Sequence, residues 1–438
     1  MALIVNDFVN GAMKVKKYRP RVLDQVIQRK LSGIGAVLIE GPKQCGKTTT
    51  AEQLAGSALY MASPDNRQTN LQLAQVQPSL LLQGKTPRLL DEWQIAPQLW
   101  DAVRFEVDHR AEPGQFILTG SAVPADRSEL FHSGTGRFAW IRMRTMSLFE
   151  SGESNGQVSL RELFSGQKDI GTANLLDLQR IAFLTCRGGW PAAIDQPDDI
   201  ALDRAIDYVD AVVNVDMSRV DSVRRNPERV RRMLRAYARH QGTQSSIEEL
   251  RADMLGGGHD ALSEKTAISY LTALRKLFVV EDVPAWNPNL RSKASIRVAD
   301  TRYFSDPSIG CAAMGIGPGS LVADMRTFGF FFETLCMRDL RVYAAALDAS
   351  VYHYRDRNGL ECDAVIGLRD GSFGLIEIKI GGDTAIEAGV ATLSKLAAKI
   401  HEAGMQSPAF LMVLTAVGSY AFRRPDGVFV VPLGCLRD

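Results

Sequence analysis

The sequence predicts an α/β fold in which a parallel sheet carries a phosphate-binding loop near the N-terminus. Short apolar strands alternate with helical segments between Tyr18 and about Ser147, and a turn of the form GxxxxGK[ST] joins a strand to a helix. Short buried strands separated by helices are typical of a parallel sheet that is covered on both faces. We therefore expect the sheet of a P-loop NTPase in the N-terminal third of the chain.

The elements of this first region follow from the apolar pattern. The strands are expected at residues 36–40, 57–62, 87–91 and 115–119. Helices are expected from residue 47 to about 59 and over 98–110.

The rest of the chain changes pattern twice. A mostly helical stretch runs from 147 to about 220, broken at 188–191, and three periodic helices follow at 227–240, 245–255 and 263–276, with Ser263 as N-cap of the last. A strand at 278–283 completes an order of elements that indicates a winged helix. A small α/β unit on a mixed sheet is then expected, with helices at 330–340 and 384–401 and strands at 350–354, 362–368, 373–380, 410–414 and about 428–431. The predicted domains are 1–147, 148–300 and 301–438.

Composition places the protein in the cytoplasm by default. The chain has 438 residues, 45% of them apolar, and a formal net charge of +1, which excludes a strongly basic surface overall. Its six cysteines are scattered without a CxxC pair, so neither a zinc site nor a disulfide framework is expected. No signal peptide is evident, and no stretch approaches the roughly 20 apolar residues that span a bilayer.

The GxxxxGK[ST] turn predicts an ATP site with Mg²⁺. Glycines let backbone N–H groups turn toward the phosphates, the following helix adds partial positive charge, and Lys47 adds a full one. Thr48 and Asp91 would hold Mg²⁺, and Glu92 would polarise the attacking water. The residues expected to bind the nucleotide are Gly41, Pro42, Lys43, Gln44, Cys45, Gly46, Lys47, Thr48 and Thr49.

Three further side chains are candidates for the catalytic set. Thr119 and Ser121 follow the next strand, where they either contact the γ-phosphate or the water, or cap the strand end. Arg137 is either a sensor or arginine finger that neutralises transition-state charge, or a surface arginine. The sequence does not decide whether it would act in its own chain or in a neighbouring copy.

Several motifs together resemble the bacterial AAA+-like ATPases that carry a DUF4143 region at the C-terminus. The resemblance rests on the phosphate loop, on the segments 18–21, 90–97, 116–122, 188–191 and 303–307, and on Phe332-Glu333 through Glu377-Ile378-Lys379, so it covers nearly the whole chain. Lys43 and Cys45 depart from the residues common in this family. The resemblance implies an ATPase core, a helical and winged-helix middle, and a C-terminal domain similar to PD-(D/E)xK (restriction-endonuclease-like) nucleases.

The C-terminal third offers a second constellation of charged residues. Glu333 is expected on a helix, Asp363 on a strand, and Glu377 and Lys379 two apart on the next strand, hence on one face. Such a set can bind a metal ion and orient a water toward a phosphodiester, with Lys379 as catalytic partner, or it can simply line the solvent face of the sheet. To bring Asp363 opposite Glu377 or Lys379, the hairpin needs a three-residue turn or a bulge. Residues 369–371 with Gly371 left-handed could provide it, and we predict that bulge.

Clustered arginines in the middle region suggest a nucleic-acid partner. Salt-dependent contact with DNA is one interpretation, with the helix at 263–276 as recognition helix, and a protein-docking role for the winged helix is the other. The leading hypothesis is therefore an ATPase whose nucleotide state controls a DNA-binding, nuclease-like half. The alternative is a nucleotide switch that acts through a protein partner or a second copy, with an inert C-terminal cluster. The arginines are Arg219, Arg224, Arg225, Arg229, Arg231, Arg232, Arg235 and Arg239.

Overall fold

The structure is a computed structural model that describes residues 5–9, 12–16, 18–121, 134–221, 223–256, 262–287 and 299–438, the first two ranges by their backbone alone. Ala122 of the 116–122 motif lies outside these residues. By their contacts the residues divide into two compact units, of which unit 1 is 1–144 with 219–223 and 276–278, and unit 2 is the remainder. The boundary predicted at 147 lies near this division. Residues on both sides of the boundary predicted at 300 fall in unit 2, so the three-domain division remains a proposal.

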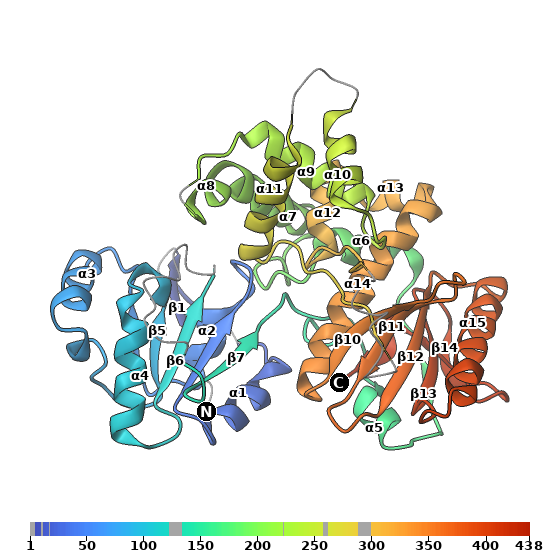
Figure 1. The fold of residues 1–438 in the computed structure, drawn as a ribbon, viewed down its shortest axis with the longest axis horizontal. Coiled ribbons are helices and arrows are strands. Elements are labelled where there is room, and N and C mark those ends of the chain that lie inside the picture. Colours follow the sequence, from blue (N-terminus) through green and yellow to red (C-terminus); the bar gives the residue numbers. More distant parts are fainter. Residues whose placement is uncertain are drawn as a thin grey trace. The chain divides into compact units, whose positions relative to one another are not determined.

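Unit 1 is built on a five-stranded sheet in which every neighbouring pair is parallel. The strand order is β4-β5-β6-β3-β7, so the first strand of the alternation lies inside the sheet (Figure 1). β7 was not predicted; its burial is irregular, with Phe138 and Ile141 buried and Trp140 exposed between them. The strands are β3 (Ala36–Glu40), β4 (Ser57–Tyr60), β5 (Arg88–Asp91), β6 (Phe116–Gly120) and β7 (Phe138–Arg142).

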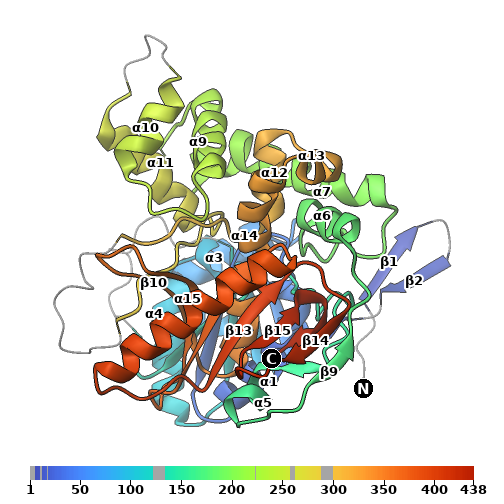
Figure 2. The ribbon, with the colours of Figure 1, turned by 90° about the vertical axis from the view of Figure 1, so that its right-hand side faces the viewer.

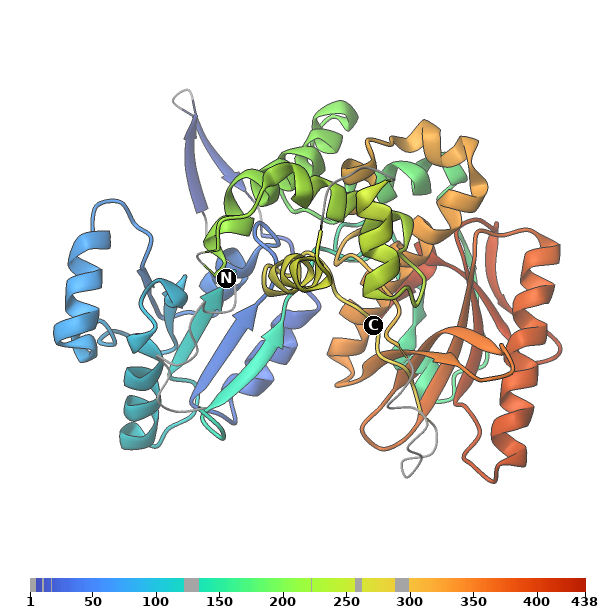
Figure 3. The ribbon, with the colours of Figure 1, turned by 45° about the horizontal axis from the view of Figure 1, so that its top comes forward.

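Helices cover both faces of this sheet, as the apolar strands predict. Figure 3 shows the sheet between the dark blue α1 and the lighter α3 and α4. The helices are α1 (Leu23–Leu31), α2 (Lys47–Glu52), α3 (Arg67–Val76) and α4 (Gln98–Arg110). The helix after the phosphate loop is thus shorter than expected. A hairpin of β1 (Val5–Val9) and β2 (Ala12–Lys16) precedes them and was not predicted.

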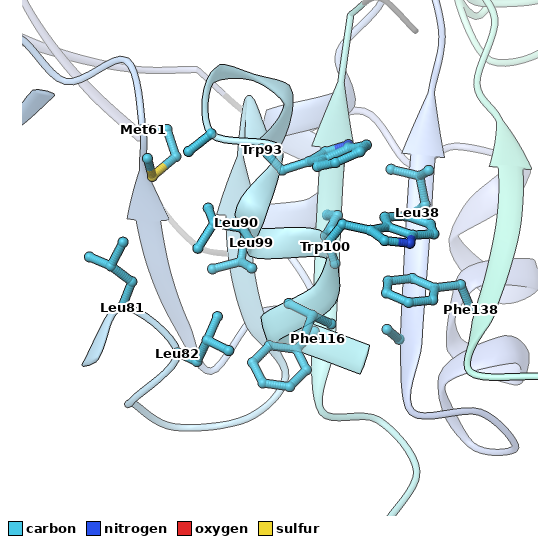
Figure 4. Close-up of a cluster of buried hydrophobic side chains, with 14 of the residues drawn as sticks. Leu38, Met61, Leu81, Leu82, Leu90, Trp93, Leu99, Trp100, Phe116 and Phe138 are labelled. Atoms are coloured by element: carbon cyan, nitrogen blue, oxygen red, sulfur yellow. The ribbon is translucent and has the colours of Figure 1, made fainter. Parts of the chain in front are cut away.

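A buried aromatic cluster fixes α4 on the sheet. Trp100 of α4 stacks on Phe138 of β7 with ring centroids 3.9 Å apart, and Trp93 lies 5.1 Å from Trp100. Figure 4 shows these rings together with Leu38 and Phe116 from the central strands. The burial of each large side chain contributes about 2 kcal/mol to the stability of the fold. The cluster therefore holds α4 and the strands that it contacts rigidly together.

The middle of the chain forms helices that belong to unit 2. The three helices predicted between 227 and 276 are present, and Asn226 and Ser246 cap the first two through their side chains. The strand expected at 278–283 is not a regular strand, since Val280 and Val283 form only single bridges; Phe278 has a left-handed φ of 57° and Pro284 cannot donate to a ladder. The winged helix therefore stays a prediction. The helices are α5 (Leu160–Phe164), α6 (Leu178–Arg187), α7 (Asp198–Ala211), the π-helical turn η4 (Val212–Asp216), α8 (Met217–Arg219), α9 (Pro227–Arg239), α10 (Ile247–Leu255) and α11 (Glu264–Lys276).

The C-terminal part of unit 2 is a seven-stranded mixed sheet with the order β10-β11-β12-β13-β15-β14-β9. Figure 2 shows α15 across a face of this sheet, where Val390, Leu393 and Leu396 pack on the strands. The predicted helices and strands of this region are all present. The edge strand β9 (Gly171–Ala173) comes from the middle of the chain and was missed, because three polar or small residues carry no strand signal. The elements are α12 (Pro307–Met314), α13 (Pro318–Ala323), α14 (Met325–Ala346), β10 (Ser350–Arg355), β11 (Glu361–Gly367), β12 (Phe373–Lys379), α15 (Asp383–Glu402), β13 (Phe410–Thr415), β14 (Tyr420–Arg423) and β15 (Phe429–Pro432), with β16 (Leu436–Arg437) paired to β8 (Val158–Ser159).

The β11–β12 hairpin has the predicted connection. Ala364 pairs with Ile376 and Gly367 with Phe373, so three residues (369–371) connect the paired ends at Leu368 and Ser372. Gly371 has φ 91°, as a left-handed turn position requires. This register places Asp363 level with Glu377.

A fully buried ion network joins distant segments of unit 2. Asp306 caps α12 and accepts a hydrogen bond of 2.6 Å from Thr145 and a contact of 3.3 Å from Arg338. Arg338 also pairs with Asp339 at 2.7 Å, and Asp339 accepts the backbone N–H of Leu148 at 2.9 Å. The network therefore anchors the chain at residues 145–148 to α12 and α14.

Candidate nucleotide-binding site

The loop between β3 and α2 is shaped by positions that only particular residues tolerate. A Cβ at Gly41 would lie 2.0 Å from the carbonyl oxygen of Met143, so this position excludes any side chain. Gly46 has φ 101° and Gln44 has φ 63°, both in the left-handed region. These alternations turn the backbone into a loop that ends at the N-terminus of α2, where a phosphate is favoured.

Lys47 is buried at the base of this loop. Its Nζ donates to the carbonyl oxygens of Gly41 and Pro42 at 2.9 and 2.8 Å, and the residue is only 5% exposed. These two bonds hold the ammonium inside the loop. A bound phosphate would therefore meet a cation that is already positioned.

The ends of α2, β5 and β6 bring three oxygen-bearing side chains together. Thr48 donates to Asp91 Oδ1 at 2.6 Å, and Thr119 donates to the same oxygen at 2.6 Å. Asp91 and Thr119 are neighbours in the parallel register of β5 and β6, which fixes their approach. Hydroxyl and carboxylate oxygens are the ligands that Mg²⁺ prefers, so Thr48 and Asp91 fit that ion.

Glu92 lies directly after β5 in the left-handed region, with φ 56°. The Ser121 hydroxyl donates to Oε2 of Glu92 at 3.0 Å. The backbone N–H of Glu92 donates to the Thr119 hydroxyl at 3.4 Å. Six residues expected at the site therefore meet at the carboxyl ends of the parallel strands. They are Lys47, Thr48, Asp91, Glu92, Thr119 and Ser121.

Arg21 supports the loop from behind and was not singled out individually. Its two Nη atoms donate to the carbonyl oxygens of Cys45 and Arg144, each at 2.8 Å, and the residue is 5% exposed. Cys45 is buried, with its thiol 3.8 Å from the Met143 carbonyl. The segment 18–21, noticed only through a resemblance, thus ties the loop to the end of β7.

Arg137 is the expected site residue that the structure places elsewhere. It precedes β7, whose Phe138 pairs with Ala36 at the start of β3, whereas the loop follows Glu40 at the other end. At about 3.3 Å per residue this separates Arg137 from the loop by roughly 15 Å along the strand, and its guanidinium pairs with Asp108 at 2.7 Å. The structure therefore places Arg137 away from the loop of its own chain.

Arg142 is a better-placed arginine that the sequence analysis missed. It pairs in register with Glu40, the residue before the loop, and its guanidinium lies 4.7 Å from the ring centroid of Phe278. If β7 had been predicted, the position of Arg142 at its carboxyl end would have indicated that this arginine lies near the loop.

The C-terminal constellation also assembles. Lys379 Nζ lies 2.7 Å from Glu377 Oε2 and 3.3 Å from Asp363 Oδ2, and Asp363 Oδ2 accepts the backbone N–H of Ile378 at 2.7 Å. Tyr303 donates to Glu333. Burial and then the Asp363 carboxylate raise the pKa of Glu333 to about 8, and the same causes raise the pKa of Glu377 to about 8. Burial alone would lower the pKa of Lys379, but Asp363 and Glu377 outweigh it and the pKa is raised.

A metal site was expected at this cluster, and it stays a prediction. Throughout the part of the chain that the structure describes, no three His, Cys, Asp or Glu residues are grouped to hold a metal ion. The ammonium of Lys379 lies between Asp363 and Glu377 and supplies the positive charge that a cation would bring. Lys379 therefore bridges Asp363 and Glu377, while Glu333 accepts its hydrogen bond from Tyr303.

Most arginines of the middle region have partners. Arg239 pairs with Asp253 at 2.6 Å and Arg231 with Asp210 at 2.8 Å. Arg225 is buried and donates to the carbonyl oxygen of Met217 at 2.8 Å. Arginines with these partners offer a weaker attraction to nucleic acid than their number suggests.

The fold and the site define a P-loop ATPase domain, and comparison with known families agrees. Residues 34–151 match the family described as "AAA domain". Residues 178–320 match "Domain of unknown function (DUF8612)", and residues 328–436 match "Domain of unknown function (DUF4143)". The expected ATPase core and DUF4143 region are thereby confirmed, while a nuclease-like nature stays a prediction.

Individual relatives add little about function. The proteins named Uncharacterized protein Mb2031c of Mycobacterium bovis and Uncharacterized protein Rv2008c of Mycobacterium tuberculosis are each 25% identical over 359 residues, which is 81% of this chain and 72% of theirs. The Walker-type ATPase paby2304 of Pyrococcus abyssi is 13% identical, covers 66% of this chain and 94% of its own, and has a TM-score of 0.39, too low to carry an argument. Among the described helices, none combines the length and apolar character needed to cross a membrane.

Proposed function

We propose that unit 1 binds ATP with Mg²⁺ and hydrolyses it. The observation that carries this proposal is the pair of 2.6 Å hydrogen bonds that Thr48 and Thr119 donate to one oxygen of Asp91, beside a loop that holds the buried Lys47. Such an arrangement of hydroxyl, carboxylate and ammonium at a helix N-terminus is suited to a triphosphate.

Each side chain has a separate task in this proposal. Lys47, held by the Gly41 and Pro42 carbonyl oxygens, donates its remaining N–H to a phosphate oxygen and offsets part of the phosphate charge. Thr48 and Asp91 hold Mg²⁺, which when bound shields the charge of the phosphates. Glu92 accepts a proton from the attacking water. The oxygen of this water bonds to the γ-phosphorus while the bond between the γ-phosphorus and ADP breaks. These roles use Gly41 to Thr49 as the phosphate-binding segment.

Release of phosphate from ATP by the full-length protein tests the proposal. Lys47→Ala should abolish turnover and ATP binding, and Glu92→Gln should abolish turnover while ATP still binds. Lys85→Ala, at an exposed lysine before β5, is the matched control and should leave both unchanged. Turnover that persists in Lys47→Ala would refute the proposal.

For unit 2 we propose that it binds a protein partner or a second copy of the chain, and that this binding depends on the nucleotide held by unit 1. The pairing of Arg231 and Arg239 with carboxylates favours this over DNA binding, and the lysine-bridged cluster favours it over metal-dependent cleavage. Incubation with plasmid, ATP and Mg²⁺ or Mn²⁺ separates the two. Cleavage that Asp363→Ala removes would establish the alternative of a DNA-binding, nuclease-like half.

A further inference from the structure

Gln94 contacts Glu92, the proposed general base, and the proposed function assigns no role to this contact. It lies in the single turn η2 (Trp93–Ile95), two residues after Glu92, and the left-handed backbone of Glu92 turns the chain back so that the two side chains meet. Nε2 of Gln94 donates to Oε2 of Glu92. Ser121 donates to the same oxygen at 3.0 Å. Both bonds use Oε2 and leave Oε1 of Glu92 for a water.

The other end of the Gln94 amide is buried and lacks a partner. Its Oε1 accepts no hydrogen bond from any residue that the structure describes. A buried acceptor without a donor costs about 1–3 kcal/mol. Among the described residues, the amide is therefore held by the bond from its Nε2 to Glu92.

Space for this amide depends on Gly120 at the end of β6. A Cβ at position 120 would lie 3.1 Å from Gln94 Oε1 and 3.2 Å from the indole nitrogen of Trp93. Any side chain there would press on the amide oxygen. Because Gly120 has no side chain, it leaves room for the unpartnered Oε1 of Gln94 between β5 and β6.

We propose that Gln94 is a positioning residue for the hydrolytic water. Its Nε2 fixes the Glu92 carboxylate so that the free Oε1 of Glu92 faces the water and takes its proton. This inference rests on the proposed hydrolysis of ATP by unit 1. It assigns to Gln94 an effect on the rate of the chemical step and none on the affinity for nucleotide.

Steady-state hydrolysis by the full-length protein tests this assignment. Gln94→Ala should lower kcat about tenfold to hundredfold, with KM and the Kd of a non-hydrolysable ATP analogue within about twofold of wild type. Gln75→Ala, at an exposed glutamine of α3, is the matched control and should leave kcat unchanged. Gly120→Ala should lower kcat in the same direction by a smaller factor, and it replaces Gln94→Ala should that variant fail to fold.

A double-mutant cycle distinguishes positioning from general structural support. Because Ser121 and Gln94 hold the same carboxylate oxygen, their effects on kcat in the Ser121→Ala, Gln94→Ala pair should depart from a simple product by at least about threefold. A kcat of Gln94→Ala within twofold of wild type, a loss confined to affinity, or multiplicative effects would each overturn the assignment while ATP hydrolysis stands. A wild-type protein without turnover would overturn the proposed function and this inference with it.

Discussion

Replacing Asp306 by asparagine should destabilise unit 2 strongly although the side chain keeps its size. Asp306 is 0% exposed, and it accepts bonds of 2.6 Å from Thr145 and 2.6 Å from Ser308 besides its contact with Arg338. Burial by itself would raise the pKa of Asp306, but Arg338 and these hydrogen bonds outweigh it and the pKa is lowered. The carboxylate is therefore ionised at neutral pH, and asparagine removes a charge that the network needs.

The size of the loss follows from what remains around Arg338. Removing one partner of a buried ion pair costs about 3–5 kcal/mol, because the other charge is left uncompensated. Asp339 still pairs with Arg338 at 2.7 Å, so the lower end, about 3 kcal/mol, is expected for Asp306→Asn. Thr145→Val keeps the size of the side chain, removes the hydrogen bond that Thr145 donates to the same carboxylate, and should cost about 1.5 kcal/mol.

Urea unfolding of the full-length protein, monitored by the transition of unit 2, measures these differences. The double variant Asp306→Asn, Arg338→Met should cost less than the sum of its single variants by at least about 1 kcal/mol, because both remove the same pair. A loss below about 1 kcal/mol for Asp306→Asn, or one equal to that of Thr145→Val, would refute the reasoning that charge is what the network requires.

Three further outcomes are expected. Gly41→Ala should abolish nucleotide binding, measured by calorimetry with ATP, because its Cβ would meet the Met143 carbonyl oxygen at 2.0 Å; retained affinity would contradict the loop geometry. Burial lowers the pKa of His353 to about 4, so the stability that the neutral ring contributes is present above pH 6.5 and is lost as the pH falls from 6.5 through 4, by up to about 3 kcal/mol. Unfolding curves of wild type and His353→Gln over this range check this, and equal slopes would refute it. Arg137→Ala should leave ATP turnover per chain unchanged in dilute protein, because its guanidinium pairs with Asp108; a large loss would indicate that it acts on the nucleotide of a neighbouring copy.

Local signals account for the parts of the fold that could be predicted. The phosphate loop, the strands beside it and the predicted C-terminal helices and strands have clear periodicity or fixed turn residues. The connection at 369–371 was predicted because it brings Asp363 to the face of Glu377 and Lys379. β7 and β9 were missed because their residues acquire a strand conformation only by pairing with distant partners. Such pairing leaves no mark in a short sequence window.

The sequence by itself determined the chemistry of the nucleotide site, since the glycines, Lys47, Thr48 and the acidic pair 91–92 are specified by spacing and by strand ends. Only the tertiary structure decided which other groups join them. Arg137 begins a strand rather than ending one and so lies at the wrong edge of the sheet, while Gln94 reaches Glu92 only because that residue has left-handed backbone. The physical reason is that the position of a side chain depends on the direction of its strand and on the backbone dihedrals of its neighbours. A change in either moves the side chain by many ångströms, and the type of the residue alone encodes neither.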